Sequence, residues 1–173
     1  LCDGVRLHGF ATRKYITDVV RPLLAGELAK AGKSFANFEV TGGGFIATGP
    51  DQASVDRAAE KLRYRVAFYG STPAYRGVLD IHGISDLGVK LHEASRKGLW
   101  SEMAAMVSDD VLDLFAVRAT YDKLAGVVAE RFGGITDSIT IDFPKGIPAG
   151  QVSALVADLK KIPSAFTGFP AAS

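Results

Sequence analysis

The chain has a single cysteine, Cys2, and its charges nearly cancel, with 20 Lys and Arg residues against 19 Asp and Glu residues. One thiol excludes an internal disulfide and agrees with a reducing compartment, so we expect a cytoplasmic protein. No block of five or six basic residues occurs. The sequence therefore shows no cluster of basic residues that could bind a phosphate backbone, and we expect no nucleic acid partner.

Other absences narrow the function further. The apolar runs are far shorter than the roughly 20 residues that span a bilayer, so no membrane partner is expected. There is no His-Glu-x-x-His motif and no cluster of Cys and His, so no metal site is expected. Gly-x-Ser-x-Gly, the motif of a serine nucleophile elbow, is also absent. What remains is a chain of 173 residues with 47% hydrophobic content. It is long enough for a single domain over residues 1–173 with a buried core.

Short apolar segments alternate with helical patterns. Residues 4–8, 38–48 and 138–143 read as strands, the second interrupted by Gly42-Gly43-Gly44, which indicates a bulge or a close backbone approach. The helical patterns cover residues 12–32 with an interruption at Pro22, 50–69, 85–98, 99–107, 109–117, 120–132 and 148–161. Strands separated by helices favour a parallel sheet, and we expect the three strands to be adjacent and parallel.

Three strands are too few for an ordinary α/β sheet, because they leave unpaired edges and an apolar face uncovered. The chain also begins at Leu1, without Met, and runs directly into its first strand. We therefore expect the C-terminal part of a longer protein. As partners we expect a second copy, in a homo-oligomer, or the missing N-terminal half.

Several segments match a known family in order and spacing. They are Asp3-Gly4 with Leu7-His8, Arg21-Pro22 to Lys33, Phe68 to Arg76, Leu79 to Gly83 with Asp86-Leu87-Gly88, and Asp110 to Val117 leading into Thr120. The chain resembles the C-terminal half of the luciferase-like flavin and deazaflavin oxidoreductases, especially the branch that uses coenzyme F420. The stretch from Ser71 to Arg76 carries most of the resemblance. Gly9 stands where the family often has Pro, and Ile84-Ser85 where Trp-Gly is common.

The resemblance implies the C-terminal portion of a (β/α)8 TIM barrel, with the three strands as its sixth to eighth and residues 49–118 as a helical insertion over the barrel mouth. It implies an oxidoreductase that transfers a hydride between a deazaflavin (F420), or alternatively FMN, and a small organic substrate. This fragment alone would then be inactive, since most of the mouth would be missing. The alternative is a non-catalytic half-barrel that serves in binding or assembly.

The candidate site residues follow from the barrel geometry, in which active sites lie at the C-terminal ends of the strands. His8 ends the first strand and is the candidate catalytic residue; the alternative is a histidine that satisfies backbone groups at a strand end. The candidate substrate ligands on the insertion are Tyr69, Tyr75, Arg76 and His82, since aromatic rings with Arg suit a planar anion. The alternative for the tyrosines is packing, and for Arg76 an ion pair with Asp80.

Overall fold

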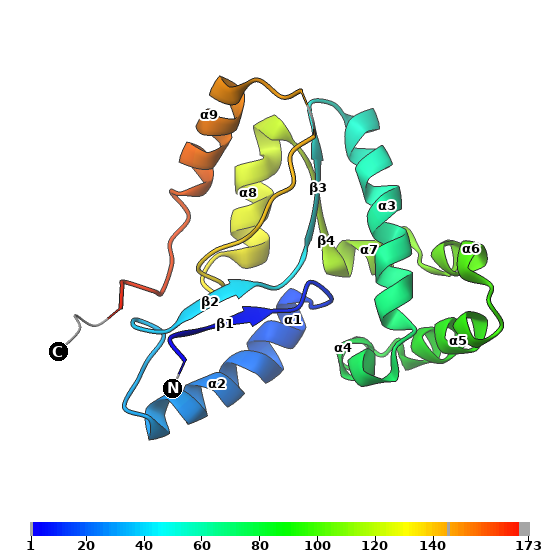
Figure 1. Ribbon diagram of the computed structural model, residues 1–173, viewed down its shortest axis with the longest axis horizontal. Coiled ribbons are helices and arrows are strands. Elements are labelled where there is room, and N and C mark those ends of the chain that lie inside the picture. Colours follow the sequence, from blue (N-terminus) through cyan, green and yellow to red (C-terminus); the bar gives the residue numbers. More distant parts are fainter. Residues whose placement is uncertain (1, 145, 170–173) are drawn as a thin grey trace.

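The computed structural model describes residues 2–144 and 146–169 (Figure 1). Two short parallel sheets organise this part of the chain. β1 (Gly4–Leu7) pairs with β2 (Glu39–Gly42), and β3 (Phe45–Gly49) pairs with β4 (Ala116–Thr120). Figure 1 shows that the chain turns sharply between β2 and β3, so that the second sheet stands upright beside the first. The fold is therefore α/β, and the first two predicted strands are adjacent and parallel as expected.

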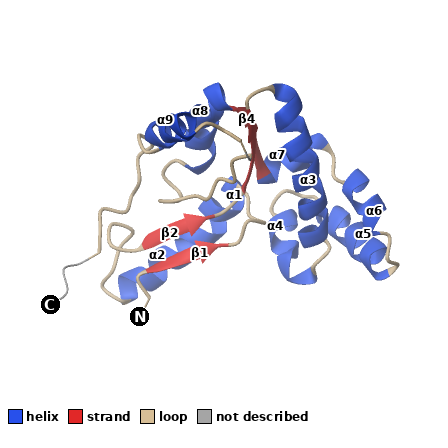
Figure 2. Ribbon diagram, turned by 45° about the horizontal axis from the view of Figure 1, so that its top comes forward, coloured by secondary structure: helices blue, strands red, loops and turns tan. Residues whose placement is uncertain are grey.

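Helices connect and cover the sheets. The helical elements are α1 (Arg13–Tyr15), η1 (Ile16–Val20), α2 (Arg21–Lys30), α3 (Gln52–Gly70), η2 (Pro73–Tyr75), α4 (Arg76–Asp80), α5 (Ser85–Arg96), α6 (Trp100–Met103), η3 (Ala104–Met106), α7 (Asp109–Phe115), α8 (Tyr121–Phe132) and α9 (Ala149–Leu159). Figure 2 shows α2 beneath the first sheet and α3 beside the second. None of the described helices is long and apolar enough to cross a bilayer.

The interruption predicted at Pro22 is a π-helix, η1, that joins α1 to α2 without a break. The backbone N–H of Arg21 donates to the carbonyl of Ile16, five residues earlier. Proline has no N–H and cannot continue the usual ladder. A single wide turn ahead of Pro22 therefore keeps the two helices continuous.

The predicted strand 38–48 is divided in two at its glycines. Gly42 and Gly43 have φ of 79° and 101°, a conformation that favours glycine. A Cβ on Gly42 would lie 2.7 Å from the carbonyl oxygen of Leu7. The backbone therefore turns here while staying close to β1, and the prediction of one strand was wrong.

The predicted strand 138–143 does not form. Only Ser138 bridges to Thr41, where the Gly42 N–H donates to the Ser138 carbonyl at 2.9 Å. Beyond that point the chain has turned away from β2 at Gly42-Gly43. Residues 139–143 therefore have no neighbouring strand among the described residues, and their alternating pattern is not used in a sheet.

The predicted helix 109–117 ends early. α7 stops at Phe115, and Ala116–Thr120 form β4 in register with β3. Over so few residues an apolar pattern does not distinguish a strand from a helix, and the free edge of β3 decides the outcome. The segment 49–118, expected as a helical insertion, is thus helical only between α3 and α7 and has strand residues at both ends.

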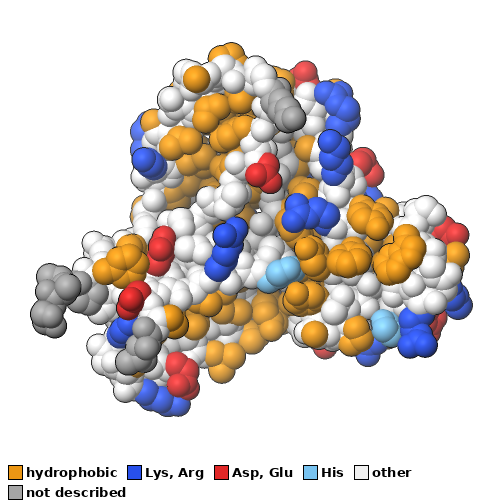
Figure 3. Space-filling model, viewed as in Figure 1, with side chains coloured by type: hydrophobic (Ala, Val, Ile, Leu, Met, Phe, Trp, Pro, Cys, Tyr) orange, Lys and Arg blue, Asp and Glu red, His pale blue; other side chains and the backbone are white. Residues whose placement is uncertain are grey.

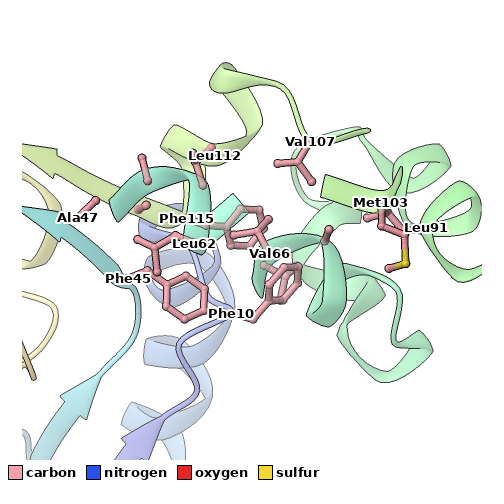
Figure 4. Close-up of a cluster of buried hydrophobic side chains, with 14 of the residues drawn as sticks. Phe10, Phe45, Ala47, Leu62, Val66, Leu91, Met103, Val107, Leu112 and Phe115 are labelled. Carbon is pink, nitrogen blue, oxygen red and sulfur yellow. The ribbon is translucent and has the colours of Figure 1, made fainter. Parts of the chain in front are cut away.

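The largest core cluster surrounds α3 (Figure 4). Leu62 and Val66 of α3 face Phe45 of β3 and Phe115 of α7. Phe10, from the loop after β1, stacks on Phe115 with ring centroids 4.3 Å apart. Burial of a phenyl ring stabilises a fold by about 1.5–3 kcal/mol. The contact therefore holds the loop after β1 against α7. A second cluster lies between α8, α9 and the 139–143 segment.

Candidate functional site

A cavity of about 470 Å³ opens at the C-terminal ends of β1 and β2. It is lined by the glycine turn, Gly42 to Gly44, and by His8 directly after β1, Phe132 from α8 and Ile139. A side chain on these glycines would collide with its neighbours: a Cβ would lie 2.8 Å from Ile16 at Gly43 and 2.8 Å from the Phe132 ring at Gly44. The turn that divides β2 from β3 therefore requires glycine, and it lines the cavity.

His8 projects into this cavity from the residue after β1, and its side chain is exposed. The backbone N–H of Phe10 donates to His8 Nδ1 at 3.0 Å. Because Nδ1 accepts, the neutral ring carries its proton on Nε2. His8 can thus offer an N–H to an oxygen or nitrogen of a bound molecule.

Two tyrosines hold the His8 ring in place. Tyr75 stacks on it, with centroids 4.9 Å apart and planes inclined by 16°. Tyr69 meets it edge-on at 4.5 Å. Tyr69 belongs to the last turn of α3, and Pro73 begins η2 so that Tyr75 returns toward the same ring. The structure therefore brings three of the five predicted site residues together, although neither tyrosine lines the cavity itself.

Arg76 and His82 lie elsewhere. Neither residue lines this cavity. Arg76 Nε is buried without a hydrogen-bond partner in the described chain. The alternative ion pair with Asp80 does not form among the described residues, and Asp80 accepts from the Ser85 hydroxyl. His82 Nε2 lies 2.7 Å from Thr12 Oγ1, at a second cavity. The substrate-binding role of these two residues stays a prediction, now without support from their position.

Three charged residues at the cavity were missed by the sequence reasoning. Arg6 from β1, Arg65 from α3 and Asp142 all line it. The Arg65 guanidinium lies 4.9 Å from the centre of the Phe45 ring, a cation–π contact. A signal was present for Arg65, because it precedes Tyr69 by four residues and so shares one face of α3. Arg6 gave no signal beyond its place in a strand.

The arrangement suits an organic anion better than a metal ion. Among the described residues, no three His, Cys, Asp or Glu side chains are grouped closely enough to hold a metal. Arg6, Arg65 and the His8 N–H offer donors to a planar, negatively charged molecule, with Asp142 as the one carboxylate beside them in the described chain. A deazaflavin or a flavin, each a planar ring system with an anionic tail, fits this donor set.

The chain is similar in sequence to proteins of bacteria and archaea. The chain is 39% identical over 163 residues to uncharacterised proteins of Mycobacterium tuberculosis and Mycobacterium bovis, covering 93% of this chain and 47% of theirs. It is 30% identical over 157 residues to the 5,10-methylenetetrahydromethanopterin reductase of Archaeoglobus fulgidus, covering 87% of this chain and 44% of that protein. The chain thus spans about half the length of the curated relatives it matches.

The fold also has a solved counterpart. The structure of the coenzyme F420 dependent tetrahydromethanopterin reductase from Methanopyrus kandleri matches with a TM-score of 0.66 and 19% identity, over 94% of this chain and 46% of that one. The model of the luciferase-like monooxygenase family matches residues 1–137. This match covers β1 to α8, including the glycine turn and the His8 segment, and the chain belongs to the luciferase-like monooxygenase family.

Proposed function

We propose that the protein containing this chain is an oxidoreductase that transfers a hydride between the deazaflavin F420 and a small organic substrate, with FMN as the alternative cofactor. The observation that carries the proposal is the cavity where β1 and β2 end, which His8 lines together with Arg6 and Arg65. The Archaeoglobus fulgidus relative, which is named a 5,10-methylenetetrahydromethanopterin reductase, supports the reaction class. The single cysteine supports a cytoplasmic location.

Each residue would have a defined task. A bound deazaflavin or flavin supplies the hydride chemistry, and the protein positions the reacting molecules. His8 donates its Nε2–H to an electron-rich atom of the ligand, and Tyr75 and Tyr69 keep its ring in that orientation. Arg6 and Arg65 hold anionic groups. Phe132 and Ile139 make the apolar wall that keeps water from the ring.

We further propose that the chain forms the C-terminal portion of a (β/α)8 barrel, within which residues 49–118 cover the mouth. The cavity is open on one side, so ligand contacts would also come from the part of the barrel outside this chain. The 173 residues alone would then bind cofactor weakly and be inactive. A second copy, or the remainder of the barrel, would cover the open sheet.

Fluorescence titration with F420 and with FMN tests the proposal. We expect saturable F420 binding by the whole protein, and much weaker binding by the 173-residue chain. Arg65→Gln should weaken binding about tenfold or more, as for a lost charged hydrogen bond. Lys90→Gln, an exposed cation of α5 outside the cavity, is the matched control. If the whole protein binds neither cofactor, the alternative of a non-catalytic module replaces the proposal; tight binding by the short chain contradicts the barrel argument.

A further inference from the structure

His82 lies at a second cavity, of about 420 Å³, that the proposed function does not use. The cavity is formed where α1 and η1, the turn after α4, and the end of α8 meet. Its lining includes Arg13, Lys14, Arg131 and His82, together with the hydroxyls of Thr12 and Thr17. The volume falls in the range of small-molecule sites.

The positive charge of this cavity is not balanced by carboxylates. Lys14 pairs with Asp18 at 2.6 Å, and these two charges cancel. Arg13 donates to the backbone carbonyls of Arg131 at 3.0 Å and Gly133 at 3.3 Å, and forms no ion pair among the described residues. The Arg13 guanidinium thus has only neutral oxygens as partners.

The Arg131 guanidinium, like that of Arg13, has backbone carbonyls as its hydrogen-bond partners. It donates to the carbonyls of Asp113 and Leu114 at the end of α7. Its Nε is buried and has no hydrogen-bond partner in the described chain. The nearby Asp113 carboxylate pairs with Arg118 at 2.8 Å, and it raises the pKa of Arg131 less than burial and Arg13 lower it. Carbonyls at helix ends carry only partial negative charge and offset a guanidinium incompletely.

The pKa values of Arg131 and His82 are both lowered, mainly by burial and in addition by the neighbouring positive charges. Burial first, and then the neighbouring Arg13, lowers the pKa of Arg131 to about 10. Burial first, and then Lys14 and Arg131, lowers the pKa of His82 from its ordinary value. The charged groups that face His82 from the surrounding elements are Arg13, Lys14, Asp18 and Arg131. A bound anion would relieve the repulsion and raise both pKa values.

We propose that this cavity binds a small oxyanion, either a phosphate or a carboxylate group, between the Arg13 and Arg131 guanidinium groups. Arginine forks match the geometry of both anions. The His82 imidazole, held against Thr12 Oγ1, closes the site on the side of the α4–α5 turn. Thr17 also lines the cavity. This site is separate from the His8 cavity and does not depend on the proposed redox activity.

The first test uses the unmodified whole protein and reads His82 by NMR. The imidazole is titrated in sodium chloride, and again in inorganic phosphate and in malonate at equal ionic strength. We expect a higher His82 pKa in at least one of the two anions, and the anion with the larger shift identifies the preferred group. Identical titration curves in all three salts would overturn the proposal.

The second test measures phosphate or malonate affinity by calorimetry. Arg13→Gln should weaken binding about tenfold or more, because it removes a charged donor. Lys30→Gln is the control, because it also removes one positive charge but lies outside the cavity, where Lys30 is exposed and paired with Glu27. Equal affinity of Arg13→Gln and wild type would count against the site. If Arg13→Gln does not fold, the His82 titration decides.

Discussion

His8 and His82 share a local sequence, a histidine followed by glycine, yet the fold gives them different surroundings. His8 follows a strand, and the strand direction carries it to the cavity mouth. His82 follows α4, and the turn at Gly83 directs it toward Thr12. Local sequence alone does not separate these outcomes, because the element that precedes each histidine sets its direction.

At His8 we predict a functional effect without a structural one. His8→Ala in the whole protein should lower turnover by about 100-fold, as for the loss of a positioned donor. The residue is exposed, so the loss of its contacts with Tyr75 and with the Phe10 N–H should lower the melting temperature only slightly. Steady-state kinetics well below the melting point, with thermal unfolding, measures both. His92→Gln is the control, since its Nδ1 contacts the Ser71 carbonyl away from the cavity. Wild-type turnover and cofactor affinity in His8→Ala would remove His8 from the site.

At Gly42 we predict a loss of stability. Its φ of 79° and the 2.7 Å approach of a Cβ to the Leu7 oxygen both oppose a side chain. Gly42→Ala should lower the free energy of unfolding by more than about 1–2 kcal/mol. Gly26→Ala in α2 meets no atom within 4 Å and should raise it by about 0.5–1 kcal/mol. Urea unfolding compares the two variants, and equal stability of Gly42→Ala and wild type would contradict the prediction.

His82 should make stability depend on pH. Its pKa is lowered from 6.5 in the folded chain. Below about pH 6.5 the unfolded chain therefore binds a proton that the folded chain does not, and the free energy of unfolding falls until the folded pKa is passed. Above about pH 6.5, His82 does not make the free energy of unfolding depend on pH. In chloride buffer, His82→Gln should lose less stability than wild type between about pH 7 and about pH 5. Parallel unfolding curves for the two proteins would show the prediction to be wrong.

At the scale of elements, α3 is the support for both the site and the core. Its buried face packs on β3, β4 and α7, and its last turn carries Tyr69 to His8. Arg63 of α3 also donates to Asp109 and to the Val107 carbonyl at the start of α7. These contacts hold α7 against α3, and β4 begins directly after α7. The cavity therefore depends on packing that begins some distance from it.

The packing at Phe115 should account for a large share of the stability. Its side chain is 0% exposed and stacks on Phe10. Phe115→Ala should lower the free energy of unfolding by about 3–5 kcal/mol because it leaves a cavity in the core. Phe68→Ala, with a side chain 44% exposed on α3, is the control and should cost much less. A loss below about 1 kcal/mol at Phe115 would mean that the core closes around the gap.

At the scale of the whole molecule, an apolar surface remains open. A groove of about 470 Å³ lies between α8, α9 and the 138–143 segment, and Ile139, Ile141 and Phe143 line it. Figure 3 shows apolar side chains gathered between α9 and this segment. β1 also has no strand on its outer edge in the described chain. Open edges and apolar faces favour association.

We predict that the 173 residues alone associate with a second copy, or with the remainder of the barrel when it is supplied. Sedimentation velocity over a range of concentrations measures this. A sedimentation coefficient that rises with protein concentration supports self-association, in which the apolar groove would be buried between chains. A compact monomer that is stable at every concentration would refute it. The whole protein, in which the proposed remainder of the barrel would cover the groove, is the control.

The sequence by itself determined the long amphipathic helices α3 and α8, the parallel pairing of β1 with β2, the family and the place of His8. Each depends on local periodicity, or on where one strand ends. Only the tertiary structure decided that residues 116–120 form a strand, that residues 139–143 do not, and that Arg65 lines the His8 cavity whereas His82 does not. A strand needs a free edge beside it, and a side chain reaches a site only if its element is packed toward it. The glycine turn at residues 42–44 sets both conditions, because it moves β3 away from residues 139–143 and presents its edge to β4.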